Sequence, residues 1–316
     1  RVLHELERRD EAWQRLRALQ TDGAAEEDTR RSAYLLEAEL RREDDHPVEL
    51  DVYNRALGAM PDDPAVLYAR ALMWERRDDI ARGERSVWRY AAALPFRPAS
   101  PITLGEGCTP MLERRLGAGP QGGTALVKCE WFMPTSSFKD RGASVMLSLL
   151  REQGIGAVLE DSSGNGGAAI ATYAAAGGMR ARILVPESTS PAKTVQSRAA
   201  GAEIQLVPGT RQDCADEALR QGRERESGSF YASHNWHPFF LHGTKTLAYE
   251  LWEDLGFQAP DNIVIPCGAG SNVLGCWIGF AELLRAGQIA RMPRLFAAQP
   301  ANCAPIARAA LGAPPA

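Results

Sequence analysis

Apolar and polar residues alternate with helical spacing in the first 85 residues of the chain. "YLLEAELRRE" (34–43) and "LDVYNRALGAM" (50–60) carry apolar positions three or four residues apart, and turn-forming residues occupy 61–64. Apolar residues at this spacing form one face of an α-helix. The pattern therefore predicts a run of amphipathic helices in residues 1–85.

A weak internal repeat runs through this helical segment. Tyr34 and Tyr68 are 34 residues apart, and "RREDD" at 41–45 recurs at the same offset as "ERRDD" at 75–79. This offset is the period of tetratricopeptide repeats. The segment holds at most about two repeats, fewer than the three or so that normally bury a continuous core. A coincidental match between unrelated amphipathic helices is the alternative.

The pattern changes near residue 85 and predicts a second domain, 86–316. Short apolar runs, separated by glycine-rich turns and stretches of helical spacing, indicate buried strands alternating with helices. This alternation is typical of an α/β fold with mostly parallel strands, in which ligands bind at the carboxyl ends of the strands. We expect strands at 124–130, 156–163, 181–186, 202–209, 262–268 and 294–300, and helices at 140–153, 166–177, 191–200, 212–226, 242–255 and 272–286.

Composition and charge narrow the choice of partner. The chain has 316 residues, of which 45% are hydrophobic and 24% charged, as expected for a globular protein with a sizeable core. No apolar run approaches membrane-spanning length. The net charge of -4 gives no electrostatic case for binding nucleic acid or anionic lipid. A small-molecule partner is the better expectation.

The six cysteines form no C-x-x-C pair, and no secretory signal precedes them. They are therefore predicted to be reduced thiols in a cytoplasmic protein. The chain begins at Arg1 instead of a methionine, which suggests a fragment.

The stretch "TSSFKDRGAS" (135–144) contains the first candidate catalytic residue. Lys139 lies where a helix is predicted to start, so its amine can point into a cleft. A partly desolvated amine loses its proton more readily and can attack a carbonyl group to form a Schiff base. A lone lysine at a helix start is more often simply solvated.

Two further stretches resemble anion-binding helix starts. "DSSGNGG" (161–167) and "PCGAGSNVLG" (266–275) each follow a predicted strand and open a helix, and backbone N–H groups at such a position favour an anion. Neither stretch is a G-x-G-x-x-G or a P-loop motif, which weakens the case for a nucleotide ligand. A pyridoxal-phosphate enzyme needs at least a Schiff-base lysine and two anion-binding sites, one for the cofactor phosphate and one for the substrate carboxylate.

Six motifs occur in the order seen in threonine synthase and its relatives in the tryptophan-synthase-β superfamily. The sequence resembles this family over residues 86–310, which implies the fold type II architecture, pyridoxal 5'-phosphate as cofactor and an amino-acid substrate. The implied reaction converts O-phospho-L-homoserine and water to L-threonine and phosphate. The motifs are "LGEGCTP", "VKCEWFMPTSSFKDRGAS", "EDSSGNGGAAIATYAA", "VPESTSPAKTVQ", "GTKTLAYEL" and "VIPCGAGSNVLG".

The resemblance also implies roles for individual residues. Lys139 matches the lysine that holds the cofactor and moves protons at the substrate carbons. Asn165 matches the residue beside the cofactor's 3'-oxygen, and Arg141 has a structural or substrate-phosphate role. The loop that receives the substrate carboxylate is Ser162, Ser163 and Gly164, and the cofactor phosphate cradle is Gly268, Ala269, Gly270, Ser271 and Asn272.

Three positions depart from the family pattern. His237 stands where asparagine is more usual, His242 replaces an acidic residue, and Ser136 replaces a glycine. These departures put the identity of the substrate in doubt. Together with His234, the two histidines could suggest a metal site, but their spacing fits no standard motif, and ordinary solvated or satisfied histidines are favoured.

The carboxyl-terminal part is expected to be incomplete. In the superfamily a hydroxyl residue from that part faces the pyridine nitrogen, and no Ser or Thr follows Ser271. Two alternatives to threonine synthase remain open. One is another fold type II lyase that deaminates threonine, serine or diaminopropionate, and the other is a non-catalytic remnant acting through its helical repeats. A homodimer and protein contacts through the amino-terminal helices are also left open.

Overall fold

The computed structural model describes residues 9–43, 52, 55–56, 58–60, 63–66, 84–117, 123–224 and 228–312. The chain divides into two compact units. The first unit comprises Arg1–Gly83 with Tyr90–Pro95, and the second comprises Glu84–Arg89 with Phe96–Ala316. Within the described parts, no helix is both long enough and apolar enough to cross a bilayer.

The first unit is helical. α2 (Arg9–Thr21) packs against α3 (Glu27–Glu43), with Leu16 and Leu40 in a shared apolar cluster. The fully buried Glu37 accepts a hydrogen bond from Gln20 at 2.6 Å. The prediction of helices is confirmed for these two segments. The repeat partners at Tyr68 and 75–79 lie outside the described residues, so the tetratricopeptide prediction stays a prediction.

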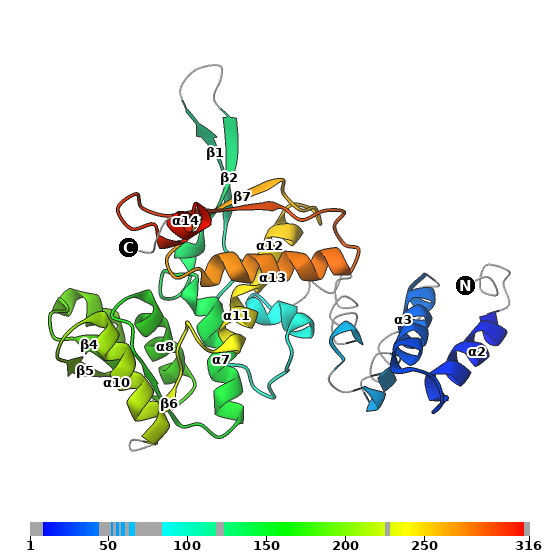
Figure 1. Ribbon diagram of the computed structural model, residues 1–316, viewed down its shortest axis with the longest axis horizontal. Coiled ribbons are helices and arrows are strands. Elements are labelled where there is room, and N and C mark those ends of the chain that lie inside the picture. Colours follow the sequence, from blue (N-terminus) through cyan, green and yellow to red (C-terminus); the bar gives the residue numbers. More distant parts are fainter. Residues whose placement is uncertain are drawn as a thin grey trace. The chain divides into compact units, whose positions relative to one another are not determined.

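The second unit contains a four-stranded parallel sheet in the order β5-β4-β3-β6, of which Figure 1 labels β4, β5 and β6. The parallel sheet predicted from the alternation is thus confirmed, and three of its strands coincide with predicted apolar runs. The fourth strand was missed because two residues are too short to show a pattern. The strands are β3 (Ala157–Glu160), β4 (Arg180–Pro186), β5 (Glu203–Val207) and β6 (Phe230–Tyr231).

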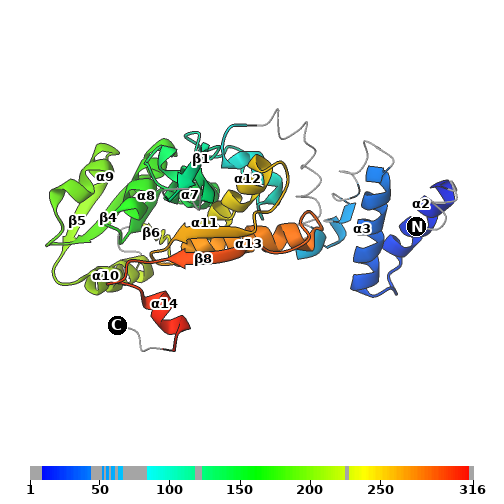
Figure 2. The same cartoon turned by 90° about the horizontal axis from the view of Figure 1, so that it is seen from above.

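Helices cover both faces of this sheet, because successive side chains of a strand point to opposite sides. Ile183 joins a cluster on the side of α8 (Asn165–Ala176) and α9 (Val195–Ala199), whereas Leu184 packs toward α10 (Arg211–Glu224). Figure 2 shows α8 and α9 on one face and α10 on the other. The apolar runs of the strands are therefore explained by burial on two sides.

A second helical layer positions the candidate site. It consists of α7 (Lys139–Glu152), α11 (Pro238–Thr244), α12 (Thr246–Asp254) and α13 (Ser271–Arg285). Glycines allow close contact within it. A Cβ on Gly243 would lie 2.1 Å from the carbonyl oxygen of Arg141, and one on Gly275 would lie 2.5 Å from Oγ1 of Thr244. The helix predicted at 242–255 is two helices that meet at Lys245, and it begins at Pro238.

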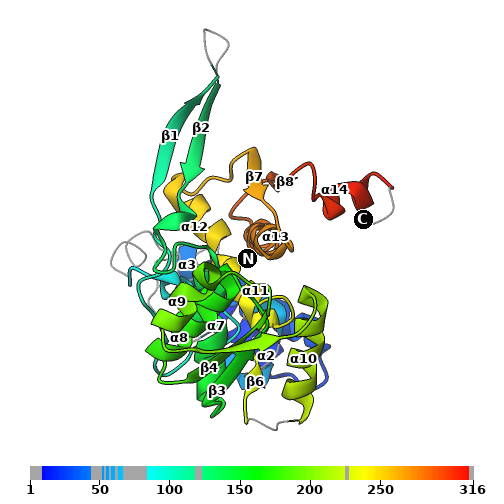
Figure 3. The same cartoon turned by 90° about the vertical axis from the view of Figure 1, so that its left-hand side faces the viewer.

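The remaining strands form two small sheets. β1 (Met111–Leu116) and β2 (Gly123–Lys128) pair antiparallel as a hairpin that extends away from the rest of its unit (Figure 3). β7 (Asn262–Pro266) and β8 (Arg294–Ala298) pair in parallel. β1 was missed because four of its six residues are exposed and three of those are charged. The short helices are η1 (Val87–Ala93), η2 (Glu130–Phe132), η3 (Pro191–Thr194) and α14 (Pro305–Ala310).

Candidate active site

Lys139 is the first residue of α7 and is partly buried. Its Nζ lies 3.3 Å from Oγ of Ser271, 4.9 Å from the ring centre of Phe138 and 5.5 Å from that of Phe240. Burial lowers the pKa of Lys139 to about 8, although the carboxylate of Glu160 opposes this shift. An amine with such a pKa is partly neutral, and therefore nucleophilic, near physiological pH.

The turn that precedes Lys139 is fixed by Asp140. The backbone N–H of Thr135 donates to Oδ2 of Asp140 at 2.7 Å, and the hydroxyl of Thr135 donates to the other carboxylate oxygen. Ser136, between them, has a φ of 62°, a conformation that glycine adopts without strain. The glycine usual at this position of the family therefore has a backbone reason.

Arg141 is fully buried in an ion-pair network. Its guanidinium donates to both carboxylate oxygens of Glu130 at 2.8 Å and to Oε2 of Glu250 at 2.8 Å. A third contact goes to the hydroxyl of Thr246 at 3.3 Å. Because these internal partners occupy the guanidinium, the geometry favours the structural alternative for Arg141 over the substrate-binding one.

The loop between β7 and α13 lies beside Lys139. Residues 266–273 line a cavity of about 80 Å³ together with Phe138 and Lys139. Gly270 has a φ of 98° and precedes the first turn of α13. A Cβ on Gly268 would meet no atom within 4 Å, and among the residues that the structure describes the buried Oδ1 of Asn272 has no hydrogen-bond partner. The structure thus brings Lys139 together with Gly268, Ala269, Gly270, Ser271 and Asn272.

The loop between β3 and α8 is built differently. Gly167, the third residue of α8, packs against this loop: a Cβ there would lie 2.0 Å from the carbonyl oxygen of Ser162, whereas a Cβ on Gly164 would meet no atom within 4 Å. Within the described residues, no hydrogen bond joins Ser163, Gly164 or Asn165 to Lys139. This loop therefore does not share the direct contact with Lys139 that Ser271 makes.

Glu160 and His234 form a buried pair that was not predicted from the sequence. This pair links the end of β3 to the surroundings of Lys139. Nδ1 of His234 lies 2.5 Å from Oε1 of Glu160, and the ring of His234 packs 5.8 Å from that of Phe240, centre to centre. Phe240 in turn contacts Lys139. The available signal was an acidic residue, Glu160, at the end of an otherwise apolar buried strand. His234, His237 and His242 do not converge on a metal: the described ranges hold no group of three or more His, Cys, Asp or Glu able to bind one.

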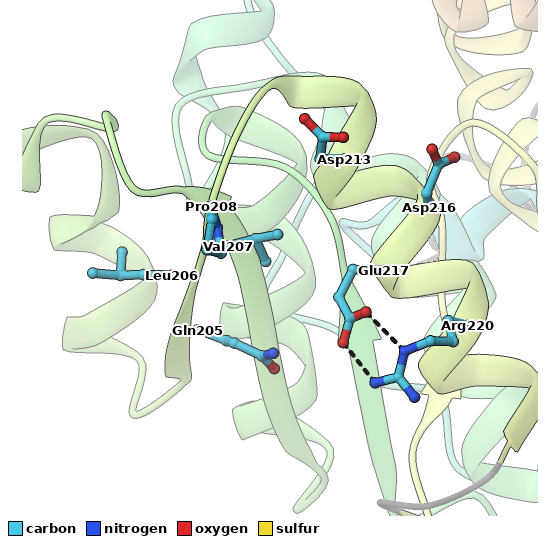
Figure 4. A pocket seen from close by; sticks show the side chains of 8 residues that line it. All are labelled: Gln205, Leu206, Val207, Pro208, Asp213, Asp216, Glu217 and Arg220. Atoms are coloured by element: carbon cyan, nitrogen blue, oxygen red, sulfur yellow. Dashed lines mark hydrogen bonds and ion pairs between the residues drawn. The ribbon is translucent and has the colours of Figure 1, made fainter.

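A second hollow lies between β5 and α10 (Figure 4), and it shares no lining residue with the Lys139 cleft. Glu217 and Arg220 face each other there through two hydrogen bonds of 2.8 Å. Those contacts hold the pKa of Glu217 at about 2. Its acidic residues are exposed or hydrogen-bonded, and its lining includes no buried amine, so the chemistry of a Schiff base points to the Lys139 cleft instead.

Comparison with known proteins identifies the family. A model of the pyridoxal-phosphate dependent enzymes matches residues 102–315. The chain belongs to this family. The resemblance inferred from the six motifs is confirmed at that level, and pyridoxal phosphate is the cofactor that the family implies.

Two curated relatives are threonine synthases. The enzyme of Methanocaldococcus jannaschii is 34% identical over 239 residues, which are 73% of this chain and 57% of the relative. The enzyme of Synechocystis sp. is 36% identical over 223 residues, which are 68% of this chain and 56% of the relative. The chain thus spans a little over half the length of these relatives. Among solved structures, O-ureido-L-serine synthase is 26% identical, with a TM-score of 0.53 and 63% of each chain covered.

The described residues fit this cofactor. Its aldehyde requires an amine that is neutral near physiological pH, which burial provides at Lys139. Its phosphate requires backbone N–H groups at an open helix start, which residues 268–272 provide. The unpartnered Oδ1 of Asn272 and the open space at Gly268 indicate a polar ligand in this loop.

Proposed function

We propose that the chain carries the catalytic site of a threonine synthase, which converts O-phospho-L-homoserine and water to L-threonine and phosphate. The curated relatives, at 34% and 36% identity, bear this name. The single observation that carries the proposal is the position of Lys139, whose Nζ lies 3.3 Å from the first side chain of α13. The Lys139 amine, whose pKa is lowered by burial, therefore lies beside the start of α13, the helix end best suited to bind the cofactor phosphate.

The residues of the cleft have separate tasks in this proposal. When bound, pyridoxal phosphate supplies an electron-withdrawing ring that stabilises negative charge on substrate carbon. Lys139 would hold the cofactor and then move protons at the substrate carbons, for which a pKa of about 8 is suitable. Asn165 would lie beside the 3'-oxygen. Residues 268–272 would bind the cofactor phosphate. The substrate carboxylate would be bound by Ser162, Ser163 and Gly164.

Arg141 would act without touching the substrate. Its ion pairs with Glu130 and Glu250 tie the first turn of α7 to η2 and α12. This arrangement fixes the backbone from which Lys139 projects. Positioning of this kind lowers the barrier by holding the reacting groups in a productive geometry.

A side-by-side assay tests the reaction. The loaded protein is given O-phospho-L-homoserine, L-threonine, L-serine or diaminopropionate, and the release of phosphate and of ammonia is measured. We expect phosphate release from O-phospho-L-homoserine, which Lys139→Ala abolishes. Ammonia release from one of the other amino acids, without phosphate release, would assign the site to a deaminating lyase.

The proposal also gives the first unit a role and the enzyme an oligomeric state. The first unit is proposed to be a tetratricopeptide-like segment that contacts other proteins; the packed pair α2 and α3 supports this. The enzyme is proposed to work in the cytoplasm as a homodimer. Analytical ultracentrifugation of the full chain measures the homodimer directly, and a monomer at micromolar concentration would contradict it.

A further inference from the structure

Glu160 and His234 form a buried pair that has no role in the reaction scheme proposed above. Glu160 is the last residue of β3 and is 0% exposed, and His234 follows β6 and is 8% exposed. Two contacts join them. Nδ1 of His234 lies 2.5 Å from Oε1, and the backbone N–H of His234 donates to Oε2 at 3.3 Å. One residue therefore engages both oxygens of the carboxylate.

The imidazole ring is also fixed from two other sides. A Cβ on Gly166 would lie 2.8 Å from Nδ1 of His234, so α8 approaches the ring as closely as a glycine permits. The ring of Phe240 lies 5.8 Å away, and the same Phe240 ring lies 5.5 Å from Nζ of Lys139. His234 is thus held between the amino end of α8 and the aromatic side chain that contacts Lys139.

The pairing determines which ring nitrogen is available. An ionised Glu160 can only accept hydrogen bonds, so Nδ1 carries the proton of the neutral ring and Nε2 keeps a lone pair. Within the described ranges, Nε2 of His234 has no hydrogen-bond partner. The other ionisable groups around the pair are Lys139 on α7, Asp161 after β3 and Arg211 on α10. Arg211 lies 2.5 Å from Asp161 and neutralises it.

We propose that His234, held by Glu160, is a second proton-transfer residue of this site and accepts the proton of the water molecule that adds to the substrate. The proposal rests on the threonine synthase reaction proposed above. An O–H bond of water breaks and its proton bonds to Nε2, while the oxygen lone pair forms the bond to Cβ. The cofactor, when bound, would supply the conjugated system that takes up the electron pair displaced from Cβ.

Glu160 makes this transfer favourable. The imidazolium that forms stays next to the carboxylate in a site with little water, where opposite charges attract more strongly than in bulk solvent. Nε2 then gives its proton to solvent before the next turnover. Lys139 and His234 would divide the work, the first handling protons on carbon and the second the proton of water.

The first test needs no turnover and so stands apart from the reaction proposed above. Diethyl pyrocarbonate modifies unprotonated imidazole nitrogens, and peptide mass spectrometry maps the modified histidine. We expect modification of His234 in the cofactor-free protein and at least a tenfold slower rate after loading with pyridoxal phosphate. Equal rates in the two forms, or no modification in either, would show that Nε2 does not face the cleft.

The charge of Glu160 gives this test a second readout. In Glu160→Gln the modification of His234 at a fixed pH should become slower, because the neutral amide can also donate a hydrogen bond and no longer fixes the ring proton on Nδ1. An unchanged rate would overturn the role assigned to Glu160. Both readouts remain valid if O-phospho-L-homoserine proves not to be the substrate.

The second test uses turnover. His234→Asn keeps an N–H donor toward Glu160 but lacks Nε2, so phosphate release should fall on the order of 10²- to 10⁴-fold in kcat with little change in KM. His237→Asn, in the same loop, is the matched control and should stay within about threefold of the parent. An active parent with an equally active His234→Asn variant would refute the proposal. If that variant does not load with cofactor, Glu160→Gln decides: kcat for phosphate release should fall about tenfold or more with little change in KM, and an unchanged kcat refutes the proposal.

Discussion

The starts of α8 and α13 are both glycine-rich, but Gly167 and Gly268 have different neighbours. In the first turn of α8, a Cβ on Gly167 would lie 2.0 Å from the carbonyl oxygen of Ser162. In the loop after β7, a Cβ on Gly268 would meet nothing within 4 Å. The first glycine is required by the protein's own packing, whereas the second leaves space beside Lys139 for a ligand. A glycine-rich helix start can therefore serve the fold or the cofactor, and only the neighbours distinguish the two.

The largest effect on stability is expected at Gly167. Gly167→Ala should lower the free energy of unfolding by about 1–3 kcal/mol or more, because the added methyl overlaps a backbone oxygen that cannot move freely. Gly156→Ala is the matched control, since its Cβ meets no atom within 4 Å. Urea unfolding of both variants measures the difference. Equal midpoints would remove the contrast between the two loops.

The opposite pattern is expected at Gly268. Gly268→Val should leave the melting temperature of the cofactor-free protein unchanged and weaken binding of pyridoxal phosphate about tenfold or more, roughly 1.4 kcal/mol. The reason is that the side chain occupies space which only a ligand would use. Titration followed by absorbance gives the affinity. A variant that binds as tightly as the parent would show that the phosphate does not approach this backbone.

The environment of Lys139 predicts a pH dependence. The neutral amine is the nucleophile, so the rate at which cofactor-free protein captures pyridoxal phosphate should rise with pH and reach half its maximum near the Lys139 pKa of about 8. Glu160→Gln should move this midpoint lower, because Glu160 raises the pKa of Lys139. A midpoint near the ordinary lysine value, about 10.4, would contradict the burial described for this side chain.

The smallest effect is expected at Asn165. Asn165→Ala should change the visible spectrum of the bound cofactor while its affinity stays within about threefold, because in the proposed arrangement the loop after β7 would supply the main contacts of the cofactor phosphate. The measurement is a spectral titration alongside Gly268→Val. Loss of binding in Asn165→Ala would mean that the loop after β3 also carries cofactor affinity, which would weaken the distinction drawn between the loops.

The sequence predicted those parts of the fold that have a strong local pattern. The apolar runs of β3, β4 and β5 are buried on both faces and were found, whereas β6 has two residues and β1 is largely exposed, so neither shows the expected pattern. Lys139 lies beside residues 268–272, but β7, which precedes them, pairs among the described strands only with β8, so the common edge of one parallel sheet does not explain this proximity.

Contacts between distant residues could not be predicted in this way. Arg141 was a candidate for substrate binding until its partners Glu130 and Glu250 were known, and those lie 11 and 109 positions away. Glu160 and His234 are 74 positions apart, and neither is unusual alone. Pairing of ionisable groups depends on tertiary packing, which the local pattern does not encode.

A comparison of two lysines of the second unit allows the most direct test of the account. Lys139 and Lys245 are both withdrawn from solvent, and burial lowers the pKa of each, but Lys245 is held by Glu282 at 2.9 Å. The measurement is borohydride reduction of the loaded protein followed by peptide mapping of the cofactor adduct. The account predicts a single adduct, on Lys139. An adduct on Lys245, or on Lys128 or Lys193, would contradict it.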